Sequence, residues 1–465
     1  MIKSRHIVAG LRLVWAFVAL WYERQVFIRS ISRCAWPDSR LAKSQALMHV
    51  LLVADPQILD HRSYPDRPAV LTWISQFLVD LNLRKSWRAA LRLRPDAVVF
   101  LGDMMDGGRF AMADSEYERY YARFASIFRS QIPTYYIPGN HDTGLGISEE
   151  FSPRAKERYI SHFGPLNNHV KLANHSIILL DAPSLAEENV SQSVRGGTSQ
   201  FIKSFADSHE RDPVVLFTHI PLSRPEKSTC GPNRERGRIR QGFGFGYQNT
   251  LSKSTSSFVL DQLRPSVIFS GDDHDYCEHT HSFTIAGQTR QVREVTVKSL
   301  SMAMGIRRPG FQLLSLVPPD PNQTTSSHSD SLCLMPDQLG IYLSTYIPLL
   351  VLSLLAIIAV NALRVLNRNR SSRGVMRSRN SDEYAEMLPH PGSARKPPPP
   401  AYSRTFELFG RRRRIAISAQ ALRLLFPSEP PTSRGFVAGA LHAVRDVAVF
   451  PLGVFALLAT WVWIL

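Results

Sequence analysis

Five short apolar runs in the first 270 residues of the chain each end in a polar residue that can bind a metal ion. Helix-like stretches separate several of these runs, and such alternation is typical of an α/β fold with helices covering a sheet. Because ligands gather at the carboxyl ends of strands in α/β sheets, we expect the five loops to meet at one site. The loops begin at Asp55-Pro-Gln57, Gly102-Asp103, Gly139-Asn140-His141-Asp142, His219 and Gly271-Asp272-Asp273-His274.

Strands and helices are predicted from the same pattern of apolar residues. Short continuous apolar runs predict buried strands, and longer periodic stretches predict helices. The predicted strands are 46–54, 97–101, 134–137, 176–180, 214–217 and 266–269, the predicted helices are 68–93, 114–130, 153–163 and 196–208, and 283–316 is mostly strand-like.

The loop residues supply carboxylate, amide and imidazole donors and no thiolate. This set suits two divalent metal ions such as Mn, Fe or Zn, bridged by one carboxylate. Two such ions, about 3.5–4 Å apart, clamp a phosphoryl oxygen and lower the pKa of a shared water. An isolated Gly-Asn-His-Asp is usually only a turn, but five such loops in order argue against a purely structural role. The expected metal ligands are Asp55, Gln57, Asp103, Asn140, His219, Asp272 and His274.

Two long uncharged runs predict membrane-spanning helices. Residues 341–363 are 23 residues without Asp, Glu, Lys or Arg. As a helix they reach roughly 35 Å, enough for a hydrocarbon core of about 30 Å. Residues 447–465 form a second such run, and Trp461 and Trp463 suit the membrane interface. A weaker candidate, 7–22, is interrupted by Arg12 and is expected to be an anchor rather than a cleaved signal peptide.

The net charge of +16 resembles that of a nucleic-acid-binding protein until it is located along the chain. Between residues 364 and 446 there are 16 Lys and Arg against 6 Asp and Glu, so most of the excess lies between two apolar runs. A basic loop beside membrane spans is explained by topology, and no nucleic-acid partner is expected. The loop should be cytosolic and residues 23–340 lumenal, although Arg24, Arg29 and Arg33 oppose this orientation.

Glycosylation sequons and cysteines fall in the segment expected to be lumenal. The sequons begin at Asn174, Asn189 and Asn322. An oxidising compartment would permit disulfides between the four cysteines. Cys230 and Cys277 each lie near a proposed metal loop, but four cysteines allow three pairings and the sequence does not choose among them.

The expected organisation has six parts. Pro-rich and Arg-rich composition, including Arg411 to Arg414, predicts disorder over much of the loop between the last two spans. The parts are a membrane anchor and lead-in (1–45), a lumenal catalytic domain (46–316), a linker (317–340), a transmembrane helix (341–363), a basic cytosolic loop (364–446) and a C-terminal transmembrane helix (447–465).

The ordered motifs D-x-(H/Q), GDxxD, GNHD, H and G-x-x-H resemble the calcineurin-like metallophosphoesterase superfamily over roughly residues 46 to 300. The resemblance implies an α/β fold, a β-sandwich flanked by helices. Further motifs narrow it to the endoplasmic-reticulum branch whose members remove ethanolamine phosphate from mannoses of GPI anchors, using manganese. These motifs are ADPQ (54–57), THIPL (218–222), TCGPNRERG (229–237), GYQN (246–249) and SGDDHDYC (270–277).

The resemblance also implies metal-binding roles. Asp55 and His274 would hold the first metal, and Asp103 would bridge both. Asn140 and His219 would hold the second.

Substrate-facing roles follow from the same resemblance. His141 would protonate the leaving alkoxide or stabilise charge on the phosphoryl group. Asp106 would hydrogen-bond His141 and favour its charged form. Arg109 would contact phosphate, although the usual Asp-Arg-Gly is replaced here by Asp106-Gly-Gly-Arg109. Tyr247, in the glycine-rich segment 242–247, would stack on a sugar, with ordinary packing as the equal alternative.

Two positions depart from the superfamily pattern. Gln57 stands in place of a His ligand, and Asp272 stands in place of the first His of GHxH. Both changes favour harder cations, so Mn is expected over Fe or Zn.

The resemblance predicts a multi-pass endoplasmic-reticulum membrane phosphodiesterase acting on GPI-anchored proteins or GPI glycolipid. Cycling to the Golgi and contacts with trafficking machinery are left open. One alternative keeps the two-metal chemistry but acts on a phosphoprotein or a nucleotide. Another is a membrane adaptor with a degenerate metal site, which Gln57 and Asp272 alone support.

Overall fold

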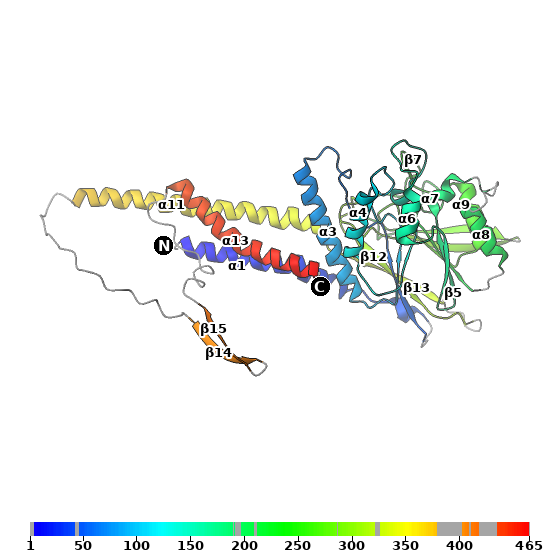
Figure 1. Ribbon diagram of the computed structural model, residues 1–465, viewed down its shortest axis with the longest axis horizontal. Coiled ribbons are helices and arrows are strands. Elements are labelled where there is room, and N and C mark those ends of the chain that lie inside the picture. The colour runs from blue at the N-terminus through cyan, green and yellow to red at the C-terminus, as the bar shows by residue number, and fades with distance from the viewer. Residues whose placement is uncertain are drawn as a thin grey trace. The chain divides into compact units, whose positions relative to one another are not determined.

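The computed structural model describes residues 4–41, 46–188, 190, 197–208, 212–285, 287–320, 326–378, 402–408, 411–417 and 435–464. The chain divides into two compact units. Unit 1 comprises Met1–Gln25 and Ile341–Leu465, and unit 2 is Val26–Gly340. The five polar loops all belong to unit 2 (Figure 1).

Unit 2 contains a five-stranded sheet in the order β13-β12-β1-β2-β3. Strands β1, β2 and β3, each followed by a polar loop, are parallel to one another. Strand β12 pairs with β1 in antiparallel fashion, and β13 pairs with β12 in the same way. The bounds are β1 (Met48–Val53), β2 (Ala97–Phe100), β3 (Thr134–Tyr136), β12 (Gly310–Leu316) and β13 (His328–Leu334).

A second, six-stranded sheet has the order β10-β11-β9-β6-β5-β4. Its four inner strands are parallel and its two edge strands are antiparallel. The bounds are β4 (Asn168–Leu172), β5 (His175–Leu180), β6 (Val214–Thr218), β9 (Val267–Ser270), β10 (Cys277–Ile285) and β11 (Gln288–Thr296).

Alternating side chains on each strand pack the two sheets against each other and against helices. On β1, Val50 and Leu52 join a core shared with Phe217 and Phe269 of the second sheet. The intervening Leu51 faces the other way, into a core that includes Trp87 of a helix. Because successive strand residues point to opposite faces, the continuous apolar runs are explained by burial on both faces.

Helices cover the outer face of each sheet, which gives the expected sandwich flanked by helices (Figure 1). On the first sheet lie α2 (Val26–Ile31), α3 (Ala69–Leu91), α4 (Asp114–Ile127) and α6 (Ala155–Phe163). On the second lie α7 (Ala182–Glu187), α8 (Thr198–Asp207) and α9 (Lys253–Leu263). Shorter elements are η2 (Pro37–Arg40), α5 (Asn140–Thr143), β7 (Phe243–Gly244) and β8 (Tyr247–Gln248).

The segment 317–340, expected to be a linker, is partly a strand. Residues 328–334 form β13 and pair along their length with β12. Their sequence, His-Ser-Asp-Ser-Leu-Cys-Leu, is too polar to predict a buried strand. The domain therefore extends past residue 316 and ends close to the following apolar run.

Two disulfides close unit 2. Cys34, just after α2, pairs with Cys333 of β13, and Cys230 pairs with Cys277. The first joins residues 299 apart in sequence and ties the start of the unit to its end. The second joins the loop after β6 to the start of β10, next to two of the polar loops. Of the three pairings that the sequence allows, the structure has this one.

Among the described residues, three helical segments are long and apolar enough to cross a membrane: Arg5–Ile31, Gln338–Arg370 and Phe436–Trp463. Most of each segment lies in unit 1, but residues 26–31 and 338–340 belong to unit 2. Each is longer than the apolar run that predicted it. Within unit 1, Val8, Ile357 and Val447 form one apolar cluster. The helical elements are α1 (Ser4–Leu20), η1 (Trp21–Gln25), α10 (Gln338–Ile341), η3 (Tyr342–Tyr346), α11 (Ile347–Ser378) and α13 (Phe436–Ile464).

Arg12, which interrupts the first apolar run, is buried, and its Nε donates a hydrogen bond to the carbonyl of Asp446 at 2.5 Å. A charged side chain inside a span is tolerated when it pairs with a polar group of another helix. The run containing Arg12 is therefore compatible with a span.

The basic loop 364–446, expected to be largely disordered, contains regular structure in its described residues. Helix α11 continues to Ser378, and α13 begins at Phe436. Between them, β14 (Tyr402–Leu408) pairs with β15 (Arg411–Ile417), which includes the four consecutive arginines.

Leu52→Ala should test the packing of the two sheets. The Leu52 side chain is fully buried between them, so we expect the change to lower the free energy of unfolding by about 2–5 kcal/mol. Chemical denaturation of the full chain in detergent would measure it. Ile147→Ala, at a fully exposed position, is the control and should change stability by less than about 0.5 kcal/mol. Equal effects of the two changes would contradict the two-sheet core.

Candidate dimetal centre

The structure brings all seven expected metal ligands to one edge of the sandwich, where parallel strands of both sheets end. Asp55 and Gln57 follow β1, Asp103 follows β2, and Asn140 follows β3. From the second sheet, His219 follows β6, and Asp272 and His274 follow β9. The side chains of Asp55, Gln57, Asp103, Asn140 and His219 are at most 2% exposed. The site is therefore made by two sheets that are brought together only in the folded chain.

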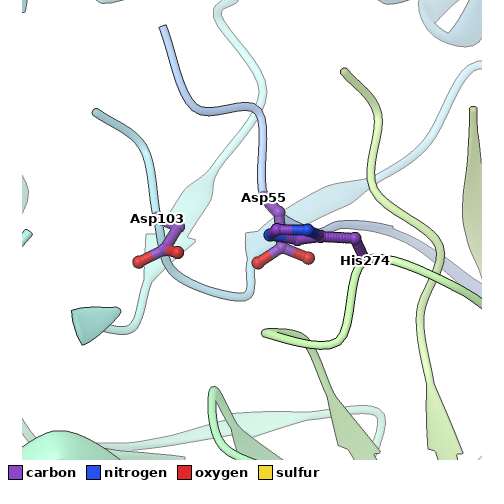
Figure 2. Close-up of side chains that lie close together, drawn as sticks. All are labelled: Asp55, Asp103 and His274. Atoms are coloured by element: carbon purple, nitrogen blue, oxygen red, sulfur yellow. The ribbon is translucent and has the colours of Figure 1, made fainter. Parts of the chain in front are cut away.

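One group of side chains consists of Asp55, Asp103 and His274 (Figure 2). One ligand atom from each lies within 4.8 Å of the other two. Oδ1 of Asp55 accepts a hydrogen bond from the backbone N–H of Asp272, whereas its buried Oδ2 has no hydrogen-bond partner. Burial lowers the pKa of His274, so its imidazole is neutral and its ring nitrogen can bind a cation.

A second group surrounds Nε2 of His219. Three oxygens face this nitrogen: Asn140 Oδ1 at 3.1 Å, Asp103 Oδ1 at 3.4 Å and Asp272 Oδ1 at 3.6 Å. The other ring nitrogen, Nδ1, lies 2.7 Å from the carbonyl oxygen of Leu101, to which it donates. With the proton held at Nδ1, Nε2 would present a lone pair to three oxygen acceptors. Asp103 is the only residue in both groups, which is the position of a bridging ligand.

Gln57 lies in the first group but is oriented as a donor. Its Nε2 is 2.7 Å from Asp103 Oδ2 and 3.4 Å from His274 Nε2. The sequence predicted a carbonyl oxygen ligand at this position. In the structure the amide N–H lies between two acceptors that a cation would otherwise join, and the amide must turn over for its oxygen to bind a metal.

Left-handed backbone conformations aim these side chains into the site. Asp55, Gln57, Asp103, Asp272 and His274 all have φ between 36° and 66°. Non-glycine residues in this region carry a conformational cost and cluster at functional sites. The strands therefore end in tight turns that return each polar side chain toward the sheet edge.

Two glycines are required by crowding at the same turns. A Cβ on Gly102, where φ is 94°, would lie 2.3 Å from His219 Nδ1. A Cβ on Gly139 would lie 2.0 Å from Asp103 Oδ1. The glycines of the GDxxD and GNHD motifs thus allow two loops to approach the proposed metal-binding side chains closely.

His141 lies beside the proposed bridging carboxylate. Its backbone N–H donates to Asp103 Oδ1 at 2.9 Å, and its Nδ1 lies 2.6 Å from the backbone oxygen of Asp106 and 3.3 Å from Asp106 Oδ1. Burial lowers the pKa of His141, but the carboxylates of Asp103 and Asp106 outweigh burial and raise it to about 9. The imidazole is therefore protonated near neutral pH, with Nε2 unengaged by these contacts.

Asp142 holds two of the loops together, a role that the sequence reasoning did not assign. Its buried carboxylate accepts hydrogen bonds from the backbone N–H groups of Met104, Met105 and Gly139. These N–H groups belong to the loops after β2 and β3. Its place in GNHD, three residues after a glycine at a helix start, is the signal of a capping carboxylate that could have identified it.

Arg109 is buried behind Asn140 rather than exposed at the site. Its Nη1 donates to the carbonyl oxygens of Gly246, at 3.0 Å, and Asn140, at 3.5 Å. The Gly246 oxygen also accepts from Asn140 Nδ2 at 2.7 Å. This bond turns the Asn140 Oδ1 atom toward His219, so Arg109 and Gly246 orient a proposed metal ligand. The predicted contact of Arg109 with phosphate stays a prediction.

The glycine-rich segment 242–247 forms a hairpin of β7 and β8 at the site. Phe245 contacts Phe151 with ring centroids 5.2 Å apart, while Tyr247 and Phe243 are exposed. The Tyr247 ring lies over Gly244, where a Cβ would be 2.4 Å from it. The predicted stacking of Tyr247 on a sugar stays a prediction.

The donor set fits two divalent cations. Burial raises the pKa of Asp55 well above its usual value. Burial alone would lower the pKa of His219, but the carboxylates of Asp103 and Asp272 outweigh burial and raise the pKa of His219 well above its usual value. Burial is the main cause of the Asp55 shift and opposes the His219 shift, but the carboxylates of Asp103 and Asp272 contribute to both, because these buried oxygens have too little positive charge between them. The first cation would be held by Asp55, Asp103 and His274, and the second by Asp103, Asn140, His219 and Asp272.

Comparison with known proteins identifies related sequences. Residues 48–276 match the family model described as calcineurin-like phosphoesterase. Cell division control protein 1 of Saccharomyces cerevisiae is 36% identical over 348 residues, which cover 70% of this chain and 68% of that protein. Metallophosphoesterase 1 homolog of Caenorhabditis elegans is 24% identical over 296 residues, which cover 63% of this chain and 77% of that protein. Metallophosphoesterase 1 of Rattus norvegicus is 24% identical over 304 residues, which cover 60% of this chain and 74% of that protein.

Two solved structures are similar at low identity. A dimetal phosphatase from Danio rerio is 14% identical, with a TM-score of 0.34, and the match covers 62% of this chain and 98% of that one. A purple acid phosphatase from yellow lupin is 12% identical, with a TM-score of 0.37, and the match covers 62% of this chain and 54% of that one.

Asp106→Asn should move the proton loss of His141 to lower pH. Asp106 raises the pKa of His141, so removing its charge should shift the alkaline limb of phosphate-ester hydrolysis down by about 1 pH unit or more. The measurement is kcat/KM against pH, for variant and parent at the same metal concentration. Asp261→Asn, on the exposed surface of α9, is the control. An unshifted limb with reduced activity would show that Asp106 does not act through His141.

Proposed function

The chain belongs to the calcineurin-like phosphoesterase family, a family of metal-dependent hydrolases, and on this premise we propose that it removes ethanolamine phosphate from a mannose of GPI anchors. The observation that carries the proposal is the meeting of five strand-end loops at one edge of unit 2, where they present oxygen and imidazole donors to two cation positions. The hydrolytic step is a phosphodiester cleavage with a sugar hydroxyl as leaving group.

The metals would be manganese. When bound, two such ions polarise a phosphoryl oxygen and lower the pKa of water. Aspartate and asparagine oxygens outnumber imidazole nitrogens among the proposed ligands, and oxygen-rich sites favour Mn over Zn. Asp272, in the place of a histidine, contributes to this preference.

His141 supplies the proton that the leaving group needs. A mannose alkoxide is a poor leaving group because its conjugate acid is a weak acid, so cleavage needs a proton donor beside the scissile bond. The Nδ1 of His141 faces Asp106, which leaves Nε2 as the donating atom. The pKa of about 9 keeps this proton in place at neutral pH. Asp106 holds the ring in position, and the hairpin 243–248 with Tyr247 would contact the glycan.

An endoplasmic-reticulum lumenal location for unit 2 is supported by its covalent chemistry. Both disulfides lie in this unit, and disulfides persist in oxidising compartments. Asn174, in a sequon, is exposed at the turn between β4 and β5. The sequons at Asn189 and Asn322 lie outside the described residues. The arginines that follow the uncharged run 341–363 would then be cytosolic, as the positive-inside rule prefers.

The two ends of unit 2 support a membrane-linked substrate. The unit begins within the candidate span Arg5–Ile31 and ends within the candidate span Gln338–Arg370. If these segments span the membrane, both ends of the catalytic unit would be tethered at its surface, where the glycan of a GPI lipid lies. GPI glycolipid or a GPI-anchored protein is accordingly the proposed substrate.

Mass spectrometry of GPI glycans from cells lacking the protein tests the proposal. We expect ethanolamine phosphate to be retained on one specific mannose. Re-expression of the parent chain should remove it, and re-expression of Asp103→Asn should not, because the shared carboxylate is lost. Asp261→Asn is the control for expression and should behave as the parent.

A normal GPI glycan in the deleted cells would overturn the substrate assignment. If the purified chain then still hydrolyses a simple phosphodiester, the alternative two-metal enzyme acting on a phosphoprotein or nucleotide is favoured. A cytosolic unit 2, which mapping of endoglycosidase-sensitive glycans at Asn174, Asn189 and Asn322 would test, would point the same way.

A further inference from the structure

The N-terminal half of α3 carries an apolar face that points away from the body of unit 2. Val70, Leu71 and Trp73 are 67%, 52% and 64% exposed, and Ile74 is 38% exposed. In a soluble domain the apolar side of a surface helix faces the core. On this helix the arrangement is reversed over its first turns.

The apolar residues fall on one side of the helix. At 100° per residue they occupy an arc of about 160°. The opposite side carries Thr72 and Val79, which are buried against unit 2, together with the polar Ser75 and Gln76. The arc, called here the α3 apolar face, consists of Val70, Leu71, Trp73, Ile74, Phe77 and Leu78.

Local hydrogen bonds hold polar side chains in place at the start of α3. Arg67 Nη1 donates to Ser75 Oγ at 3.1 Å, and Ser75 Oγ donates to the carbonyl of Leu71 at 2.9 Å. The Arg67 guanidinium also stacks on Tyr64, 3.5 Å from the ring centroid. Trp73 and Phe77 stack on each other with centroids 6.1 Å apart, so the aromatic part of the face is pre-ordered.

The same side of α3 meets a membrane-derived helix further along. Lys85, which falls in the same arc, lies 4.7 Å from the ring centroid of Phe27 of α2. Helix α2 packs on α3 within unit 2 and forms the last turns of the candidate span Arg5–Ile31. This side of α3 is therefore covered at Lys85 by the end of a candidate membrane span. Nearer the N-terminus of the helix, the α3 apolar face continues the same side and is exposed.

We propose that the α3 apolar face lies in the interfacial layer of the bilayer that the chain's own helices span. An apolar helical face with a tryptophan suits this layer, where such helices bury to about 5–10 Å. The contact with α2 holds the rest of α3 at the membrane boundary, so lipid is the occupant available to the exposed half. The loop 58–68 joins this helix to Gln57 of the metal site, so the contact would orient that site toward membrane-linked substrates.

Lipid contact can be measured with a fluorophore on a single introduced thiol. All four native cysteines are in disulfides, so a new cysteine is labelled selectively. The full chain carrying Leu71→Cys with an environment-sensitive dye is placed in phosphatidylcholine vesicles. Gln76→Cys, on the polar side of α3, and Ser257→Cys, exposed on α9, are the matched controls.

We expect dye at position 71 to lose about half its emission or more when the phosphatidylcholine carries a spin label near the headgroup, and to be shielded from aqueous iodide. Dye at 76 and 257 should show little lipid quenching, and 257 should be quenched by iodide. Iodide quenching at 71 equal to that at 257 would overturn the proposal. Shielding from both quenchers would also overturn it, since another part of this chain or a second copy would then cover the face.

Discussion

The folded structure brings several buried hydrogen-bond acceptor atoms together with too few hydrogen-bond donors among them. Asp55, Asp103 and His274 on one side, and Asn140, His219 and Asp272 on the other, share a volume in which the backbone supplies few donors. Bringing ionised carboxylates together at low dielectric is costly unless positive charge lies among them. Two cations satisfy this requirement, and the left-handed turns, the glycines and the buried Asp142 hold the acceptors in place for them.

The strands and the loops of the site were predictable because burial and chemistry coincide in the sequence. Runs such as 97–101 are apolar on both faces and are followed at once by a polar loop, so the strand and its metal-ligand candidates were predicted from the same stretch of sequence. Predicted strand and helix ends agree with the observed ones to within three residues; β1, predicted from residue 46, begins at Met48. The helix 68–93 was likewise predicted close to the observed Ala69–Leu91.

Other features depended on contacts that a sequence does not display. β13 was missed because its alternating polar residues become a strand only by pairing with β12. The cysteine pairing, the donor orientation of Gln57 and the placement of Arg109 behind Asn140 each depend on distant segments. The exposed side of α3 was equally hidden, since the sequence shows an apolar stripe but not which way it faces.

The proposed dimetal centre requires Asp103 to be shared between two metal ions. Metal analysis of the full chain, purified in detergent and equilibrated with manganese, tests this most directly. The parent should hold two ions per chain, and Asp103→Asn should hold fewer than one, because both positions lose the shared carboxylate. A parent that binds at most one ion, or an Asp103→Asn chain that retains two, would contradict it.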